Sequence, residues 1–290
     1  MELCFSCIAG LDSRRWLGGA WDREIAMKIF RFALAGLLLP VLIPAQGQTE
    51  RPPTAAEIKR DKLVGLNQLI TQTNAAMQAK DWPKAEDFAA KLIATNAELA
   101  AAYPGDMSFP GSAPEYARLL GDAHLNLGEY DDAVAAYDKS VGLGQGLLDG
   151  GKDFTGLKAT MGLALMSKGN AFLKLKKSKE ATACYEQAVP FVANPATAWF
   201  NICAVKYDTG DMDGAVVAAD KAIALDPTKA DAYFIKGSVL FGNATVDASG
   251  KFVVSAETLA ALRKYLELAP QGGHVDDVKQ MLDAVGASVK

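Results

Sequence analysis

Few residues of this chain could bind a metal or act on a substrate. Among 290 residues there are four cysteines and two histidines. Cys4 and Cys7 form a C-x-x-C pair, a spacing used both for metal binding and for thiol redox chemistry. A single pair, without a second pair or a flanking βαβ pattern, is weak evidence for either function. We therefore predict no metal site and no bound cofactor.

The two histidines do not complete a catalytic site. We predict that His124 packs inside the fold and that His274, which follows two glycines, lies at the start of a helix. The pairs Asp131–Asp132 and Asp276–Asp277 fall in the first turns of expected helices, where carboxylates interact favourably with the helix dipole. No set of nucleophile, base and orienting group can be assembled. The sequence therefore predicts a protein that is not an enzyme.

Composition and charge indicate a folded, helical protein. Half of the residues are hydrophobic, which is enough for a substantial core. Alanine-rich runs such as AVVAADKAIALDP favour helix, because alanine loses least on entering one. The net charge of −4 provides no basic surface for nucleic acid, so we predict no nucleic-acid partner.

The segment from Met27 reads MKIFRFALAGLLLPVLIPAQGQ and is typical of a signal peptide. Lys28 and Arg31 precede an apolar run that is too short to span a bilayer comfortably, and small residues follow at Ala45 and Gly47. We predict that translation starts at Met27 and that residues 1–47 are absent from the mature protein. The mature protein is then periplasmic or secreted, without stable insertion in a membrane. An uncleaved single anchor is the alternative.

An internal repeat is the strongest signal in the rest of the chain. A short polar turn is followed by alanine and, four residues later, by an aromatic residue or a second alanine. The step occurs in KDWPKAEDFAA, GEYDDAVAAYD, KKSKEATACYE and GDMDGAVVAAD. The first alanines of these steps are separated by 48, 48 and 34 residues, so two linkers carry 14 extra residues each. We predict that these linkers lengthen the helices of the second and third repeats.

These residues resemble the tetratricopeptide repeat, a 34-residue helix-turn-helix unit with W-x2-L-G-x2-Y in its first helix and A-x3-F, then P, in and after its second. The match is strongest where Trp199 opens a unit and Pro227 closes it. The resemblance implies an all-α helix-turn-helix repeat solenoid over residues 48–290, wound as a right-handed superhelix and closed by a C-terminal capping helix at 274–286. The expected repeats, about five, are 66–99, 114–147, 162–195, 196–229 and 230–272.

The resemblance also implies a concave groove lined by the first helices of the repeats. The residues expected to bind a partner there are Asn74, Arg118, Asp122, Asn126, Asn170, Lys174, Phe200, Asn201 and Tyr207. Asn170 and Asn201 match two asparagines that hold a peptide carboxylate in chaperone-binding members of the family. Met166, Asp231 and Ile235 stand where those members have basic residues. We therefore expect no carboxylate receptor, because a lone amide pair cannot replace charge-assisted hydrogen bonds.

The function that follows is an exported adaptor or scaffold that binds a protein or peptide in this groove without catalysis. Two alternatives stay open. One is an envelope accessory protein that binds a cell-wall or secreted-polymer ligand, and the other is a membrane-tethered assembly scaffold.

Two cysteines remain in the expected mature chain. Cys184 falls on the second helix of one expected repeat and Cys203 on the first helix of the next. In an oxidising compartment they could form a disulfide, provided that their Cα atoms lie within about 7 Å. The alternative is that both are ordinary packing thiols.

The stretch LFGNATVDASGKFVV, residues 240–254, interrupts the fifth repeat with about nine extra residues. Residues 244–247 and 251–254 flank Ala248, Ser249 and Gly250, where glycine can take a positive φ. This pattern predicts a small β-hairpin, which either covers a helix end or serves as a partner-binding arm.

Overall fold

The structure is a computed structural model that describes residues 51–248, 250 and 252–287. The chain divides into two units, Met1–Pro52 and Pro53–Lys290, and all the described helices belong to the second. The predicted start at Met27, the predicted signal peptide and the Cys4–Cys7 pair lie outside the described residues, as does Ser249 of the predicted hairpin turn.

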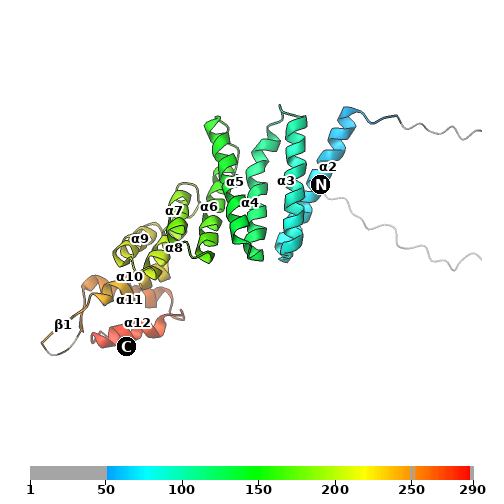
Figure 1. Ribbon diagram of the computed structural model, residues 1–290. Helices are drawn as coiled ribbons and strands as arrows, with labels where there is room; N and C mark the ends of the chain where they lie inside the picture. The colour runs from blue at the N-terminus through cyan, green and yellow to red at the C-terminus, as the bar shows by residue number, and fades with distance from the viewer. Residues whose placement is uncertain (1–50, 249, 251, 288–290) are drawn as a thin grey trace, which may run out of the picture. The chain divides into compact units, whose positions relative to one another are not determined.

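The described residues form eleven helices and one two-stranded hairpin (Figure 1). The helices are α2 (Ala55–Ala79), α3 (Trp82–Ala102), α4 (Ser108–Leu127), α5 (Tyr130–Asp149), α6 (Leu157–Lys174), α7 (Ser178–Ala188), α8 (Pro195–Asp208), α9 (Met212–Leu225), α10 (Ala230–Gly242), α11 (Ala256–Leu268) and α12 (Val275–Ala284). The strands are β1 (Thr245–Val246) and β2 (Phe252–Val253). The predicted class, an all-α helix-turn-helix repeat solenoid with a small β-hairpin, is confirmed.

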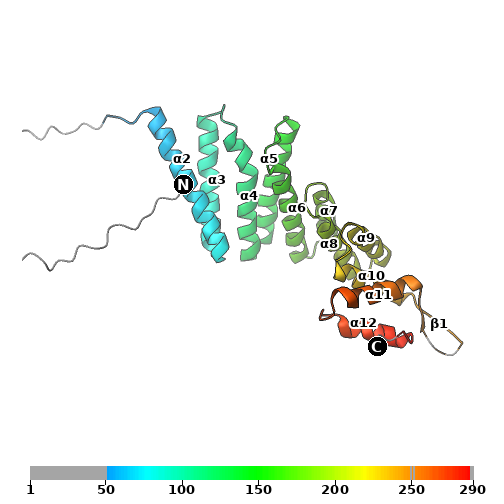
Figure 2. The ribbon, with the colours of Figure 1, turned by 180° about the vertical axis from the view of Figure 1, so that it is seen from behind.

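Each helix packs against the next along the chain, so the helices form successive pairs from α2–α3 to α10–α11. The same order is visible from behind in Figure 2. Across the pairs, α4 also contacts α6, and α8 contacts α10. The first helices of these neighbouring pairs therefore lie next to one another. Among the described residues, no helix combines the length and the apolar character that a membrane span requires.

The turns between helices follow from local capping. The Thr54 hydroxyl accepts a 3.3 Å hydrogen bond from the Glu57 amide, and the Glu57 carboxylate accepts a 2.8 Å bond from the Thr54 amide, which together form a capping box at the start of α2. Gly128 ends α4 with a φ of 85°, a conformation that favours glycine. Ser255 caps α11 by accepting a 3.1 Å bond from the Thr258 amide.

The extra residues of the two long linkers mostly continue the helices. α4 and α5 have 20 residues each and α6 has 18, whereas α8 and α9 have 14 each. The predicted lengthening is confirmed for these three helices. It is wrong for α7, which has 11 residues and ends at Ala188. Pro190 follows closely, and proline cannot continue a helix because it lacks a backbone N–H and clashes with the preceding turn.

The two helices of a pair touch through one small and one large residue. A Cβ atom placed on Gly121 of α4 would lie 2.6 Å from the Tyr137 ring of α5, and one on Gly169 of α6 would lie 2.5 Å from the Tyr185 ring of α7. In the next pair the larger residue is on the first helix instead. Cys203 of α8 stands 34 residues after Gly169, and the buried Ala219 of α9 stands 34 residues after Tyr185. The close packing of each pair thus depends on one member being small.

The hairpin and the last helix complete the C-terminal end. Thr245 pairs with Val253 and Val246 with Phe252 in an antiparallel register. α12 packs against α11. The buried residues that form the core of this region are Leu262, Tyr265, Val278 and Leu282.

Candidate partner-binding groove

The residues predicted to bind a partner lie on the first helices of the helical pairs. They are Asn74 on α2; Arg118, Asp122 and Asn126 on α4; Asn170 and Lys174 on α6; and Phe200, Asn201 and Tyr207 on α8. The structure brings the three residues of α4 into one hydrogen-bonded network. Phe200 and Tyr207 pack against another cluster, which includes the buried Ile202.

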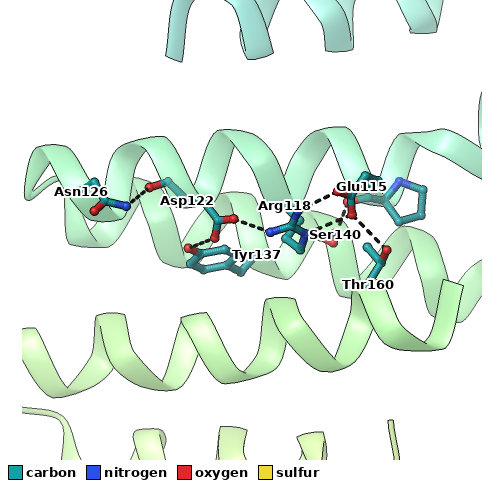
Figure 3. Close-up of polar contacts among 8 residues, drawn as sticks. Glu115, Arg118, Asp122, Asn126, Tyr137, Ser140 and Thr160 are labelled. Atoms are coloured by element: carbon teal, nitrogen blue, oxygen red, sulfur yellow. Dashed lines mark hydrogen bonds and ion pairs between the residues drawn. The ribbon is translucent and has the colours of Figure 1, made fainter. Parts of the chain in front are cut away.

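The network on α4 is centred on Arg118 (Figure 3). Arg118 Nη2 lies 2.6 Å from Glu115 Oε1, and Arg118 Nη1 donates to Asp122 Oδ2. The Tyr137 hydroxyl of α5 donates to Asp122 Oδ1 at 2.7 Å. The Thr160 hydroxyl of α6 donates to Glu115 Oε2 at 3.0 Å. One chain of polar contacts therefore joins three consecutive helices.

This network is mostly shielded from solvent. The side chains of Arg118 and Asp122 are 14% and 18% exposed. Burial opposes the charge on Arg118, but the carboxylates of Glu115 and Asp122 outweigh it and raise the pKa of the guanidinium above its usual value. Burial also raises the pKa of the Tyr137 phenol, and the Asp122 carboxylate adds to the shift. Arg118 and Asp122 are thus already paired within the protein, where they hold α4 against α5.

Two of the predicted asparagines make hydrogen bonds of their own. Asn126 donates from Nδ2 to the Asp122 carbonyl oxygen at 2.7 Å, one turn back on the same helix. Asn170 Oδ1 accepts a 2.7 Å hydrogen bond from the Tyr185 hydroxyl of α7. Both asparagines are exposed, so each keeps a surface that a partner could reach.

The other predicted residues differ in how open they are. Asn74 and Lys174 are exposed, whereas Phe200 and Asn201 are half-buried. The Lys229 ammonium lies 5.8 Å from the centre of the Phe200 ring. Tyr207 lines a groove at the C-terminal end of the described unit.

The two described cysteines are buried free thiols. Of the two possibilities that the sequence left open for Cys184 and Cys203, the structure has the free thiols and not the disulfide. Burial raises the pKa of Cys203 to about 12 and also raises the pKa of Cys184. Because the thiolate is the reactive form, neither residue is suited to act as a nucleophile.

The groove beside Tyr207 has a volume of about 530 Å³ and lies between α8, α10, β2 and α12. It is lined by Tyr207, Phe234, Ser238, Phe241, Phe252, Asp277, Gln280, Met281 and Ala284. Phe241 and Phe252 approach with ring centres 6.1 Å apart. Phe234 stacks on His274 with ring centres 3.8 Å apart and an angle of 6° between the planes.

A few polar groups accompany this aromatic lining. The Ser238 hydroxyl oxygen is buried and has no hydrogen-bond partner among the described residues. The Asp277 carboxylate lies 3.3 Å from His274 Nδ1. Mostly apolar walls with a small number of hydrogen-bonding groups are typical of a binding site for apolar side chains.

The sequence predicted Tyr207 and the hairpin but missed the other aromatic walls of the groove. Phe234, Ser238 and Phe241 are separated by four and three residues on α10, so they share one helix face, and this spacing was a readable signal. Met281 belongs to α12, which packs against α10. No local sequence pattern indicates this contact between the two helices.

Comparisons with known proteins agree with this architecture. Two sequence models of the tetratricopeptide repeat match the chain, over residues 74–147 and 163–189. No curated protein matches it. The solved structure of YrrB, a tetratricopeptide-repeat protein with an unusual peptide-binding site, is 17% identical with a TM-score of 0.50, over 78% of this chain and 100% of that one. Aspartyl phosphate phosphatase F from Bacillus subtilis is 14% identical with a TM-score of 0.51, over 77% and 54% respectively. The MamA protein is 18% identical with a TM-score of 0.48, over 71% and 92%.

The fold and the groove define a helical-repeat scaffold, a class in which stacked repeats provide extended surfaces for binding other proteins. Residues 74–147 and 163–189 of this chain match the tetratricopeptide repeat, as its sequence motifs predicted, and the described helices on either side continue the same helical pairing.

Proposed function

We propose that this protein is an exported scaffold that binds an extended segment of another protein in the groove between α8, α10, β2 and α12, without catalysing a reaction. The observation that carries the proposal is the gathering of aromatic rings around one groove beside the hairpin. Tyr207, Phe234, Phe241 and Phe252 come from three separate elements and line the same space.

The apolar character of the groove continues onto the hairpin. Val246, Phe252 and Val253 have exposed fractions of 59%, 45% and 49%. Neighbouring apolar side chains exposed beside an aromatic groove favour a surface that another molecule covers. Apolar side chains of a partner segment would gain free energy by leaving water in this groove.

An extended segment suits this place better than a helix, because a strand edge borders the groove. Within the described residues β1 pairs only with β2, so each strand has one edge free of ladder hydrogen bonds. A peptide added to such an edge directs alternate side chains to one face, where pockets can select them. The exposed Gln280 amide in the wall is available to bond polar groups of the segment. The structurally similar YrrB is itself described as peptide-binding.

The exported location rests on the segment from Met27 to Gly47, with its basic residues, apolar run and small residues. N-terminal sequencing of the protein isolated from its native cells tests this part. A mature chain that begins near Gln48 supports export with cleavage. A chain that still carries the apolar run would instead favour a tethered scaffold.

Photo-crosslinking followed by affinity measurement tests the groove. A photoreactive amino acid replaces Phe252, the crosslinked protein is identified, and the affinity of its purified segment is measured against the full chain. We expect Phe252→Ser to weaken that affinity at least tenfold. Val217→Ser is the matched control, because Val217 is 55% exposed on α9 but does not line the groove.

The first-helix surface predicted from the family provides the competing location. If Asn170→Ala with Asn201→Ala abolishes binding while Phe252→Ser leaves it unchanged, the partner binds along the first helices and the proposed groove is wrong. If Phe252→Ser and Val217→Ser weaken binding equally, the effect of Phe252→Ser is not specific to the groove.

A further inference from the structure

We propose that Glu86, His124 and Glu129 form a binding site for a borderline divalent cation such as Zn²⁺. The three residues come from α3, from α4 and from the turn between α4 and α5. One potential ligand atom of each lies within 4.8 Å of the other two. An imidazole nitrogen with two carboxylate oxygens is a donor set that Zn²⁺ uses, and it leaves a fourth position for water.

The backbone fixes two of the three ligands. Gly128 ends α4 in the left-handed conformation, and the Glu129 amide donates a 2.9 Å hydrogen bond to the His124 carbonyl oxygen. This cap turns the chain so that the Glu129 side chain returns to the ring of His124. His124 Nδ1 and Glu129 Oε2 lie 2.6 Å apart. The two ligands are therefore positioned by a turn that the fold already needs.

The packing of α3 on α4 supplies the third ligand. Ala85 of α3 and Ala123 of α4 are both fully buried and belong to one apolar cluster. Glu86 and His124 are the next residues along each helix, and this close approach places Glu86 Oε1 4.0 Å from His124 Nδ1. Small residues at the contact thus hold the third donor near the other two.

The charges of this cluster favour a cation. Within the described residues neither Glu86 nor Glu129 forms an ion pair with a lysine or arginine, and both carboxylates approach the same ring nitrogen of His124. The His124 side chain is 14% exposed, so its donor atom is largely shielded from competing water. A divalent cation would neutralise both carboxylates at once.

The distances suit zinc after small side-chain movements. Zn–N and Zn–O bonds of about 2.0–2.2 Å place tetrahedral donors about 3.3–3.5 Å apart. The separations of 2.6 Å and 4.0 Å lie on either side of that value. The Glu86 and Glu129 side chains are 39% and 44% exposed, which leaves their carboxylates room to adjust. A bound ion would link α3 to the turn between α4 and α5.

The other histidine offers an internal comparison. His274 has a single carboxylate neighbour, Asp277 at 3.3 Å, and its ring is stacked on Phe234. It belongs to no three-donor cluster among the described residues. A His274→Gln variant therefore controls for general effects of losing an imidazole.

Calorimetric titration of the full chain with Zn²⁺ tests the site. The chain carries Cys4→Ser and Cys7→Ser, so that the C-x-x-C pair outside the described residues cannot bind the metal. We expect one ion per chain, an affinity reduced at least tenfold by each of His124→Gln, Glu86→Gln and Glu129→Gln, and no change with His274→Gln. Zn²⁺ should also raise the unfolding temperature of the parent chain but not of the three variants, because it binds only the folded site.

Three results would overturn the proposal. They are the absence of saturable binding to the parent chain, binding that persists at full strength in the variants, and an equal loss in His274→Gln. Circular dichroism establishes that each variant is folded. If His124→Gln does not fold, the two glutamate variants still decide the question, because their side chains are partly exposed.

Discussion

The Tyr137 hydroxyl donates a 2.7 Å hydrogen bond to Asp122 Oδ1, and 48 residues further along the chain the Tyr185 hydroxyl makes the equivalent 2.7 Å bond to Asn170 Oδ1. In both pairs the tyrosine of the second helix reaches over a glycine of the first, at 121 and at 169. The acceptors differ in charge, since Asp122 is a carboxylate paired with Arg118 and Asn170 is a neutral amide. The same contact therefore has a different energy in the two repeats.

Removing the two hydroxyls separately should show this difference. We expect Tyr137→Phe to lower the free energy of unfolding by about 1.5–3 kcal/mol, because the bond to a buried charged group is lost. Tyr185→Phe should lower it by only about 0.5–1.5 kcal/mol, since its acceptor is neutral and the asparagine remains exposed to water. Urea unfolding of both variants measures the two values. Equal losses would show that the charge on Asp122 contributes nothing to the contact.

A single methyl group at the helix contact should be harmful. Gly121→Ala would place a Cβ atom 2.6 Å from the Tyr137 ring, so the helices must shift, and we expect a loss of about 1–3 kcal/mol. Gly65→Ala on α2 is the matched control, because no atom lies within 4 Å of its added Cβ. There alanine should stabilise the protein by about 0.5–1 kcal/mol through its higher helix propensity. Thermal unfolding of the two variants gives the sign of each effect. A stabilising Gly121→Ala would contradict the close-packing argument.

The unpaired hydroxyl in the groove should behave differently from a paired one. Ser238→Ala removes a buried oxygen without a hydrogen-bond partner among the described residues, and we expect it to stabilise the protein by up to about 1 kcal/mol. Ser140→Ala removes a buried hydroxyl that donates at 2.7 Å to the Pro114 carbonyl oxygen, and it should destabilise by about 1 kcal/mol. Both substitutions replace a helical serine by alanine and so raise the helix propensity equally. The denaturant midpoints of the two variants can therefore be compared directly. A destabilising Ser238→Ala would mean that this hydroxyl is already satisfied in solution.

Alkaline pH should destabilise the protein through Cys203. Burial raises the pKa of this thiol from 9.0 to about 12. Below pH 9 both folded and unfolded chains keep the proton, and the stability is fully present. Between about pH 9 and pH 12 only the unfolded chain loses the thiol proton. Ionisation of Cys203 therefore lowers the free energy of unfolding by up to about 1.4 kcal/mol per pH unit.

The variant Cys203→Ala isolates this contribution. Its urea midpoint, measured from about pH 8 to about pH 11, should decline less steeply than that of the unmodified chain. Residues such as Tyr185 titrate in both proteins and cancel in the difference. Parallel profiles would indicate that Cys203 is not protected from water in the folded state.

The helical pairs could be predicted from the sequence because their contacts repeat. The step from one alanine to an aromatic residue or a second alanine recurs every 34 or 48 residues, and a glycine, 121 or 169, faces the ring in the two pairs that have a tyrosine there. The hairpin was readable from β-branched residues around Gly250, which takes a φ of 81°. Local chemistry of this kind requires no knowledge of distant residues.

The roles of Arg118 and Asp122 were harder to predict. Repeat geometry placed both on the surface toward a partner. However, Glu115 and Asp122 stand three residues before and four after Arg118, and these spacings allow ion pairs within one helix. That signal was present, whereas the contribution of Tyr137 depends on how α5 lies against α4. The sequence alone could not provide this packing.

The groove and the proposed cation site needed the structure for the same reason. Glu86 and His124 are 38 residues apart and follow no local metal-binding spacing, so the sequence predicted no metal site. Phe252 and Met281 likewise line the same groove only after the hairpin and α12 have both folded beside α10.

Two neighbouring helical pairs place the larger contact residue on opposite helices, and this limits which helices of the chain could be joined in a hybrid protein. Gly169 faces Tyr185, whereas Cys203 and Ala219 occupy the matching positions of the next pair. A hybrid that joined α8 to α7 would bring a thiol against a tyrosine ring, and one that joined α6 to α9 would leave an empty space between glycine and alanine. Gene duplication or grafting can therefore preserve the packing only if it moves both helices of a pair together.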